Sequence, residues 1–136
     1  ALVSSMDLVV DATDNFTARF AINRACVAAQ VPLVSGAAIR AEGQVMVFDA
    51  RHRDTPCYQC LYADQGEEAL NCSEAGVLGP LVGMIGSLQA MEAIKMIAGI
   101  GKPLLGRLLL LDAMTMQWRE MTVPRDPACP VCGASG

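Results

Sequence analysis

The chain has 136 residues, which is the size of a single domain. Hydrophobic residues make up 53% of it and aromatic residues only 4%, so the core is aliphatic, as in α/β domains with a covered sheet. The net charge of −4 and the absence of a basic run argue against nucleic acid as a partner.

Cysteine content and apolar runs bear on the compartment. Six cysteines are fewer than a disulfide-rich scaffold of this length carries, and no signal peptide is visible. We therefore expect a reducing, cytoplasmic environment. The longest apolar run lies near residues 77–88 and is interrupted by Gln89, Glu92 and Lys95, which predicts no membrane span.

The first predicted elements form a strand–helix–strand unit. Residues 6–10 predict a buried strand, residues 16–30 a helix and residues 31–36 a second strand, parallel to the first. The first strand runs into Asp11-Ala-Thr-Asp14-Asn15, at the edge where open α/β sheets bind ligands. Asp14 can be a helix cap or a carboxylate that holds Mg²⁺ near a nucleotide phosphate, and these residues do not decide between the two.

The later elements complete the sheet. Residues 43–48 predict a third strand, and residues 81–98 a long helix, apolar nearly all round its first half and therefore buried. Gly83 and Gly86 allow close approach of a neighbouring helix, such as one from a second subunit. Residues 107–111 and 117–123 predict two strands whose short connection makes them antiparallel.

Two cysteine doublets, Cys57-Tyr-Gln-Cys60 and Cys129-Pro-Val-Cys132, predict a metal site. Each C-x-x-C turn directs two thiolates at one point, and two such turns supply the four sulfurs of a closed tetrahedral zinc site. The doublets are separated by residues 61–128, far more than the about 15–20 residues of a zinc ribbon, so the ion would fasten the tail to a central loop. The alternatives are two local redox pairs or two disulfides.

Two cysteines lie outside the doublets. Cys72 precedes a Gly-rich turn and the long helix, where a thiol is more nucleophilic, although a buried inert cysteine is an equal alternative. Cys26 lies on the first helix among alanine and valine, so we assign it to the core.

Taken together, these segments resemble the C-terminal half of the MoeB/ThiF family, the bacterial relatives of ubiquitin-activating enzymes. The match covers nearly the whole chain in order and spacing. Its motifs are Asp7-Leu-Val-Val-Asp-Ala-Thr-Asp-Asn15, Pro32-Leu-Val-Ser-Gly-Ala-Ala-Ile-Arg40, Glu42-Gly-Gln44, Pro56-Cys-Tyr-Gln-Cys60, Cys72-Ser-Glu-Ala-Gly-Val-Leu-Gly-Pro80, Gly83-Met-Ile-Gly-Ser-Leu-Gln-Ala-Met-Glu-Ala-Ile-Lys95 and Cys129-Pro-Val-Cys-Gly133.

The resemblance implies a Rossmann-like adenylation fold, a mixed sheet with flanking helices and a four-cysteine zinc clasp. It implies an adenylyltransferase that uses ATP and Mg²⁺ to adenylate the C-terminal glycine of a MoaD- or ThiS-like ubiquitin-like sulfur carrier. Asp14 would be the Mg²⁺/ATP ligand, with Asn15 beside it. Cys72 matches a motif cysteine that in some members binds the carrier covalently or handles sulfur. A homodimer, and a sulfurtransferase or cysteine desulfurase as a further partner, are expected.

Residues 1–136 would form the C-terminal part of one such domain, because the family's Gly-rich loop, ribose ligand and phosphate-binding arginine and lysine lie upstream of the motifs present. By itself the chain is therefore expected to be inactive. Residues 35–44 and 87–95 look more like the MoeB branch, in molybdopterin synthesis. Residues 71–80 and 117–119 look more like the ThiF branch, in thiamine synthesis. The alternative is a non-catalytic zinc-stabilised module for dimerisation or for docking a ubiquitin-like protein.

Overall fold

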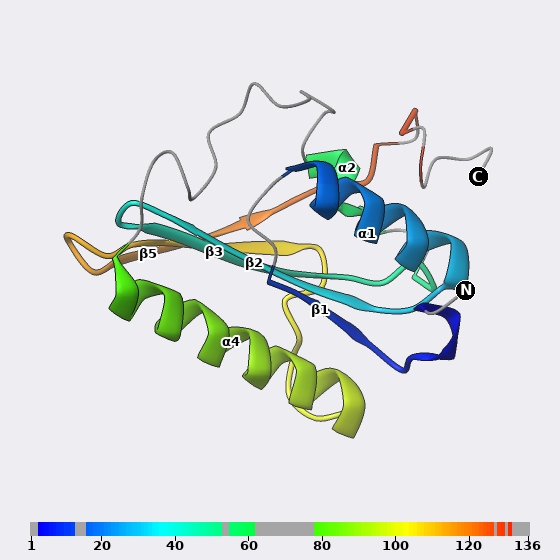
Figure 1. Ribbon diagram of the computed structural model, residues 1–136, viewed down its shortest axis with the longest axis horizontal. Coiled ribbons are helices and arrows are strands. Elements are labelled where there is room, and N and C mark those ends of the chain that lie inside the picture. Colours follow the sequence, from blue (N-terminus) through cyan, green and yellow to red (C-terminus); the bar gives the residue numbers. More distant parts are fainter. Residues whose placement is uncertain are drawn as a thin grey trace.

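The computed structural model describes residues 3–12, 16–52, 55–61, 78–126, 128–129 and 131. Within these residues, five strands form one mixed sheet in the order β1-β2-β3-β4-β5 (Figure 1). The strands are β1 (Val9–Asp11), β2 (Leu33–Ile39), β3 (Glu42–Phe48), β4 (Arg107–Asp112) and β5 (Gln117–Thr122). β1 pairs with β2 in parallel and the other neighbours are antiparallel, which confirms both predicted orientations.

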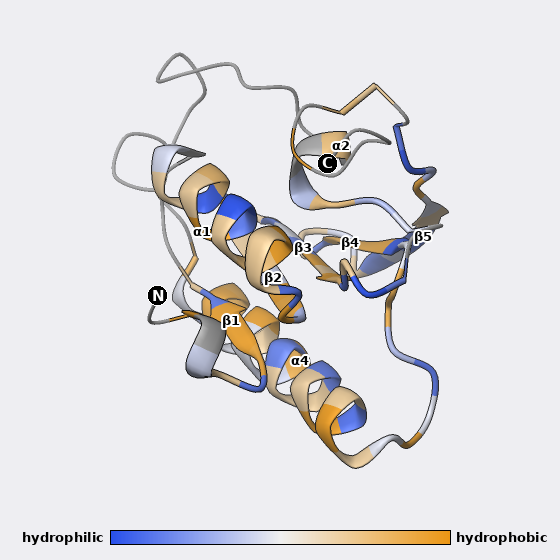
Figure 2. Ribbon diagram, turned by 90° about the vertical axis from the view of Figure 1, so that its right-hand side faces the viewer, coloured by the Kyte–Doolittle hydropathy of each residue, from blue (hydrophilic) through white to orange (hydrophobic). Residues whose placement is uncertain are grey.

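The helices lie on opposite faces of this sheet. The elements are η1 (Val3–Ser5), α1 (Phe16–Ala29), α2 (Tyr58–Leu61) and α4 (Gly79–Ala98). Figures 1 and 2 show α1 on one face and α4 on the other, with α2 on the same side as α1. The fold therefore has three layers, in which the helices cover the two faces of the sheet around β1, β2 and β3, while all residues of β5 are exposed.

The first strand differs from its prediction. It begins at Val9 and not at residue 6, because its ladder with β2 consists of Val9 with Leu33, Val10 with Val34 and Asp11 with Ser35. Residues 3–5 instead form the short helix η1. The strand therefore reaches one residue further than predicted, to Asp11.

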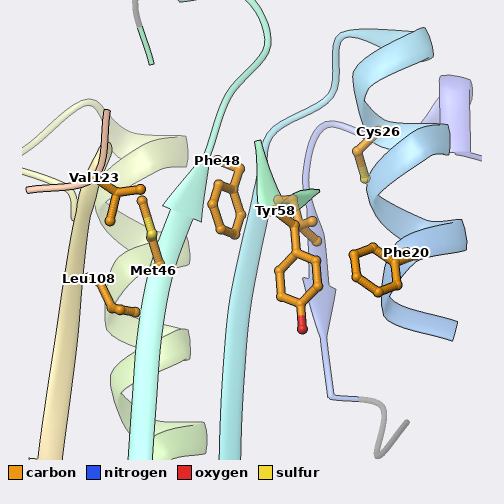
Figure 3. Close-up of a cluster of buried hydrophobic side chains, with 8 residues drawn as sticks. Phe20, Cys26, Met46, Phe48, Tyr58, Leu108 and Val123 are labelled. Atoms are coloured by element: carbon orange, nitrogen blue, oxygen red, sulfur yellow. The ribbon is translucent and has the colours of Figure 1, made fainter. Parts of the chain in front are cut away.

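Alternation along β3 divides the core into two clusters. Val45 and Val47 face α4, where they pack with Leu81 and Ile85. Met46 and Phe48 point the opposite way, into a cluster that includes residues of α1 and α2 (Figure 3). Successive strand side chains point to opposite faces, and each fully buried aliphatic or aromatic side chain contributes about 1.5–3 kcal/mol. A single strand thus anchors both layers.

The prediction that α4 is buried, because its first half is apolar nearly all round, is wrong: only one face is buried. Its buried residues are Leu81, Ile85, Gln89 and Glu92, which follow one another at helical spacing along a single face. The outward face exposes Val82, Met91, Ile94 and Ile97, the last to 70%. The sequence shows that the helix is apolar, but the sheet covers only one of its sides, so the remaining apolar residues stay outside.

The length of α4 also corrects the membrane expectation. The helix has 20 residues and is long and apolar enough, by length and composition alone, to cross a membrane. In this fold it packs on β2 and β3, and most of its residues are coloured as hydrophobic in Figure 2. Two of its buried residues, Gln89 and Glu92, are polar and lie on the face that packs against the sheet.

Gln89 and Glu92 anchor α4 by hydrogen bonds. The Gln89 Nε2 atom donates to the carbonyl oxygens of Asp11, at 2.8 Å, and of Val34, at 3.4 Å. Gly36 makes room for this amide, since a Cβ there would lie 2.3 Å from Gln89 Cδ. Glu92 Oε1 accepts from the backbone N–H of Leu104 at 2.6 Å, and Lys95 neutralises the carboxylate. The end of β1 is thereby held from the α4 side of the sheet.

Candidate metal centre

The first cysteine doublet is fixed to the core beside it. Cys57 and Cys60 form a turn in which the Cys60 N–H donates to the Cys57 carbonyl at 3.1 Å. Between them, Tyr58 stacks edge-on against Phe20, with ring centroids 5.4 Å apart, and against Phe48, at 5.9 Å (Figure 3). The aromatic contacts hold the turn against α1 and the end of β3.

The second doublet reaches the first by way of the segment after β5. The Asp126 N–H donates to Cys60 Sγ at 3.4 Å. The Asp126 side-chain carboxylate accepts from the N–H of Ala128 at 2.9 Å. The Asp126 backbone carbonyl accepts from the N–H of Cys129 at 3.0 Å. This turn, built on Asp126, brings Cys129 to the first doublet, on the same side of the sheet as α1 and α2 (Figure 1).

Three sulfurs converge on one point. The Cys57 Sγ lies 3.9 Å from Cys60 Sγ and 3.7 Å from Cys129 Sγ, and all three lie within 4.8 Å of one another. Sulfurs at the corners of a tetrahedron about 2.3 Å from a zinc ion are about 3.8 Å apart. The observed spacing therefore fits a tetrahedral thiolate site. The fourth predicted ligand, Cys132, lies outside the described residues.

These distances weigh against two separate cysteine pairs. Cys57 lies closer to Cys129, from the other doublet, than to Cys60 in its own. Both separations far exceed the S–S bond of about 2.05 Å. Cys57 and Cys129 are each only 3% exposed, and Cys60 is partly exposed. A set of converging thiolates is the chemistry of a structural metal site.

Cys26 belongs to the core, as predicted. It is 2% exposed and packs in the cluster that contains Phe20 and Tyr58. Burial, and secondarily the charge of Asp11, raise the pKa of its thiol to about 11. The Cys26 thiol is therefore protonated at neutral pH and unsuited to act as a nucleophile or metal ligand.

Asp49 shapes the loop that leads to the first doublet. Its fully buried carboxylate accepts from the Arg51 backbone N–H at 3.0 Å and from Arg51 Nη2 at 2.7 Å. Burial opposes ionisation of this carboxyl, but the hydrogen bonds and positive charge of Arg51 outweigh it, so the pKa of Asp49 is lowered. Thr55 Oγ1 donates to the His52 carbonyl at 2.7 Å and closes the same loop.

The predicted nucleotide-binding residues Asp14 and Asn15, and the predicted nucleophile Cys72, lie outside the described residues. The chain enters residues 13–15 from the end of β1 and leaves them at the start of α1. Near this edge, Arg19 Nη1 donates to the Gly36 carbonyl at 2.9 Å, as Gln89 does to Asp11. Side chains thus hold the backbone at the end of β1 and at the middle of β2, one residue beyond the partner of Asp11.

Residue-by-residue interpretation missed three residues with structural importance at these sites, Asn23, Asp49 and Gln89. Each is a buried polar residue within or beside an apolar stretch, and that position is the signal that the sequence carries. Asp49 bonds to Arg51 in the following turn, whereas Asn23 and Gln89 bond to residues on other elements. Only the tertiary structure identifies the partners of Asn23 and Gln89.

The ThiF family model matches residues 1–131. The chain belongs to the ThiF family. It is 59% identical over 133 residues to the molybdopterin-synthase adenylyltransferase of Escherichia coli (strain K12), covering 98% of this chain and 53% of that protein. It is 46% identical to the Sulfur carrier protein ThiS adenylyltransferase of the same organism, covering 98% of this chain and 52% of that protein. The higher identity to the first agrees with the predicted likeness to the MoeB branch.

Solved structures of Escherichia coli MccB share the fold. The complex with succinimide has a TM-score of 0.74 at 21% identity, covering 93% of this chain and 39% of that chain. The predicted mixed-sheet adenylation fold is thereby confirmed. The chain spans about half the length of the curated ThiF-family relatives described above.

We predict that Asp49→Asn destabilises the fold by about 1–2 kcal/mol at neutral pH, a modest figure because Arg51 is half exposed. The pKa of Asp49 is lower in the folded state, so its contribution is complete above the unfolded value near 3.8 and lost as pH falls through the folded value. Urea unfolding at about pH 7 and about pH 3 should therefore show a shrinking difference between the two proteins.

Asp112→Asn is the matched control, because the carboxylate of this exposed aspartate accepts a local hydrogen bond from the Met114 N–H. It should cost less than Asp49→Asn at neutral pH. An Asp49→Asn penalty that stays constant between the two pH values would contradict a role for the ionised carboxylate.

Proposed function

We propose that the complete protein adenylates the C-terminal glycine of a MoaD- or ThiS-like sulfur carrier in molybdopterin or thiamine biosynthesis. The observation that carries this proposal is 59% identity to a molybdopterin-synthase adenylyltransferase along 98% of the chain. A MoaD-like carrier is favoured, because the identity to the ThiS adenylyltransferase is lower, at 46%. The reaction would take place in the cytoplasm.

Residues 1–136 would supply the C-terminal part of one adenylation domain. The Gly-rich loop and the arginine and lysine that contact phosphate would come from the remainder of the complete protein, so the chain alone would form no acyl-adenylate. Its coverage of 53% of the most similar relative described above supports this division.

The nucleotide would lie at the carboxyl ends of β1 and β2, the edge at which open α/β sheets bind ligands. Asp14, with Asn15 beside it, would hold Mg²⁺, which when bound neutralises charge on the phosphate oxygens and orients pyrophosphate. The described residues near this edge support the placement. Gln89 fixes the Asp11 carbonyl and Arg19 fixes the Gly36 carbonyl, so the backbone around the turn is preorganised.

Cys57, Cys60, Cys129 and Cys132 would hold a structural zinc ion. Four thiolates leave no open position for substrate, so the ion would stabilise the fold and take no part in catalysis. Cys72 would act after adenylation, when the activated glycine is open to a sulfur nucleophile. A sulfurtransferase or cysteine desulfurase would then supply the sulfur. A relative from rice is named "Adenylyltransferase and sulfurtransferase MOCS3", a name that pairs adenylation with sulfur transfer.

The complete protein would form a homodimer through the outward face of α4. Val82 and Ile94 are each about half exposed there. Among the described residues, and apart from the adjoining backbone of α4 itself, no heavy atom lies within 4 Å of a Cβ built at Gly83 or Gly86, so both positions are open to a closely packed partner. An exposed apolar helix face of this kind is typical of an oligomer interface.

Asp14→Ala in the complete protein tests the proposed chemistry. We expect carrier-dependent exchange of pyrophosphate into ATP to be lost, because the Mg²⁺ ligand is removed while the fold and the metal centre remain. His52→Ala, at an exposed loop position, is the control and should leave exchange unchanged. If Asp14→Ala retained full exchange, Asp14 would have no part in the mechanism.

Val82→Glu tests the dimer. A charge at this exposed position should convert the complete protein from dimer to monomer in sedimentation velocity, without loss of zinc. Met121→Glu places the same charge at an equally exposed methionine on β5, remote from α4, and should leave the dimer intact. A Val82→Glu protein that remains dimeric would remove α4 from the interface.

A further inference from the structure

Asn23 connects α1 directly to the metal centre. Its side chain is 1% exposed and makes two long-range hydrogen bonds to the first cysteine doublet. Its Oδ1 accepts from the Tyr58 backbone N–H at 3.0 Å, and its Nδ2 donates to Cys57 Sγ at 3.5 Å. A helix residue thus contacts both the backbone and a sulfur of the doublet.

The orientation of this amide is fixed by its neighbours. The two ends of an asparagine amide have nearly the same shape, so hydrogen-bond partners decide which end is oxygen. The Tyr58 backbone N–H can only donate, and it therefore requires the oxygen. The Asn23 NH₂ group must then face Cys57, whose sulfur is the acceptor, and a charged thiolate accepts more strongly than a neutral thiol.

We propose that Asn23 is a positioning residue of the metal centre, which orients the Cys57 sulfur and stabilises the negative charge it carries as a metal ligand. The inference rests on the zinc site of the proposed function and adds to it a residue outside the cysteine doublets. Residues that hydrogen-bond to metal ligands without binding the metal themselves commonly lower the metal affinity by about 10–100-fold when they are replaced.

Asn23 can be tested by substitution, whereas the comparable contact to Cys60 cannot. Cys60 Sγ accepts from the backbone N–H of Asp126, which no side-chain change removes. Asn23 Nδ2, by contrast, is a side-chain donor to a predicted ligand. It also lies on the helix that begins directly after Asp14 and Asn15, so it joins the metal centre to the element that follows the proposed nucleotide site.

Asn23→Asp in the complete protein is the decisive substitution. The aspartate keeps the size of the side chain and an oxygen for the Tyr58 N–H, but it replaces the donor facing Cys57 with a second acceptor. Measurements at about pH 8 favour the ionised carboxyl, which cannot donate a proton to the sulfur, against the burial and negative charge that raise its pKa at this site. We expect competition with a chromophoric chelator to show zinc affinity reduced by about 10–100-fold.

Gln89→Glu is the matched control. It makes the same amide-to-acid change at a buried donor, but Gln89 bonds to the Asp11 and Val34 carbonyls on the α4 side of the sheet. This variant should lose stability and retain zinc affinity. Cobalt substitution adds a spectroscopic readout, because the thiolate-to-cobalt charge-transfer band should shift in Asn23→Asp and stay in place in Gln89→Glu.

Asn23→Ala removes the amide without adding charge and decides the question if Asn23→Asp does not fold. Zinc affinity within about twofold of the wild type in Asn23→Ala, or an equal loss in Gln89→Glu, would overturn the role of Asn23. A wild-type protein that binds no zinc would overturn the proposed metal site as well. The two failures are therefore distinguishable.

Discussion

The convergence of cysteine sulfurs from two distant segments is the interaction on which the architecture depends. Cys57 follows the loop after β3, and Cys129 follows the segment after β5, yet their sulfurs lie 3.7 Å apart. Several thiolates this close would repel one another, and a divalent cation between them reverses the sign of that interaction. The segment that contains Cys129 lies beside the turn at Cys57, next to the aromatic contacts of Tyr58.

The same face of the sheet carries the connection from the metal centre to α1. Asn23 joins that helix to Cys57, and Phe20 on the same helix packs against Tyr58. On the opposite face, α4 holds the end of β1 through Gln89. β1 is therefore flanked on one side by a helix hydrogen-bonded to Cys57 and on the other by a helix hydrogen-bonded to its last residue, Asp11.

Much of this organisation could be predicted from the sequence, because it depends on local patterns. Apolar periodicity placed α1 and α4 within about two residues of their bounds. The C-x-x-C spacing predicted that Cys57, Cys60 and Cys129 meet. The exposed face of α4 could not be predicted, since composition does not reveal how many sides of a helix a sheet covers. The start of β1 was also missed, because ladder contacts with β2 define it. The importance of Asn23 depends on partners 34 and 35 residues away.

The coordination of the metal in the complete protein tests the central claim most directly. X-ray absorption at the zinc edge should give four sulfur ligands at about 2.3 Å, because all four cysteines of the doublets would bind one ion. Replacing Cys129 by serine should change one of these sulfurs to oxygen or release the ion. A shell dominated by nitrogen or oxygen, or a purified protein that contains no zinc, would contradict the account.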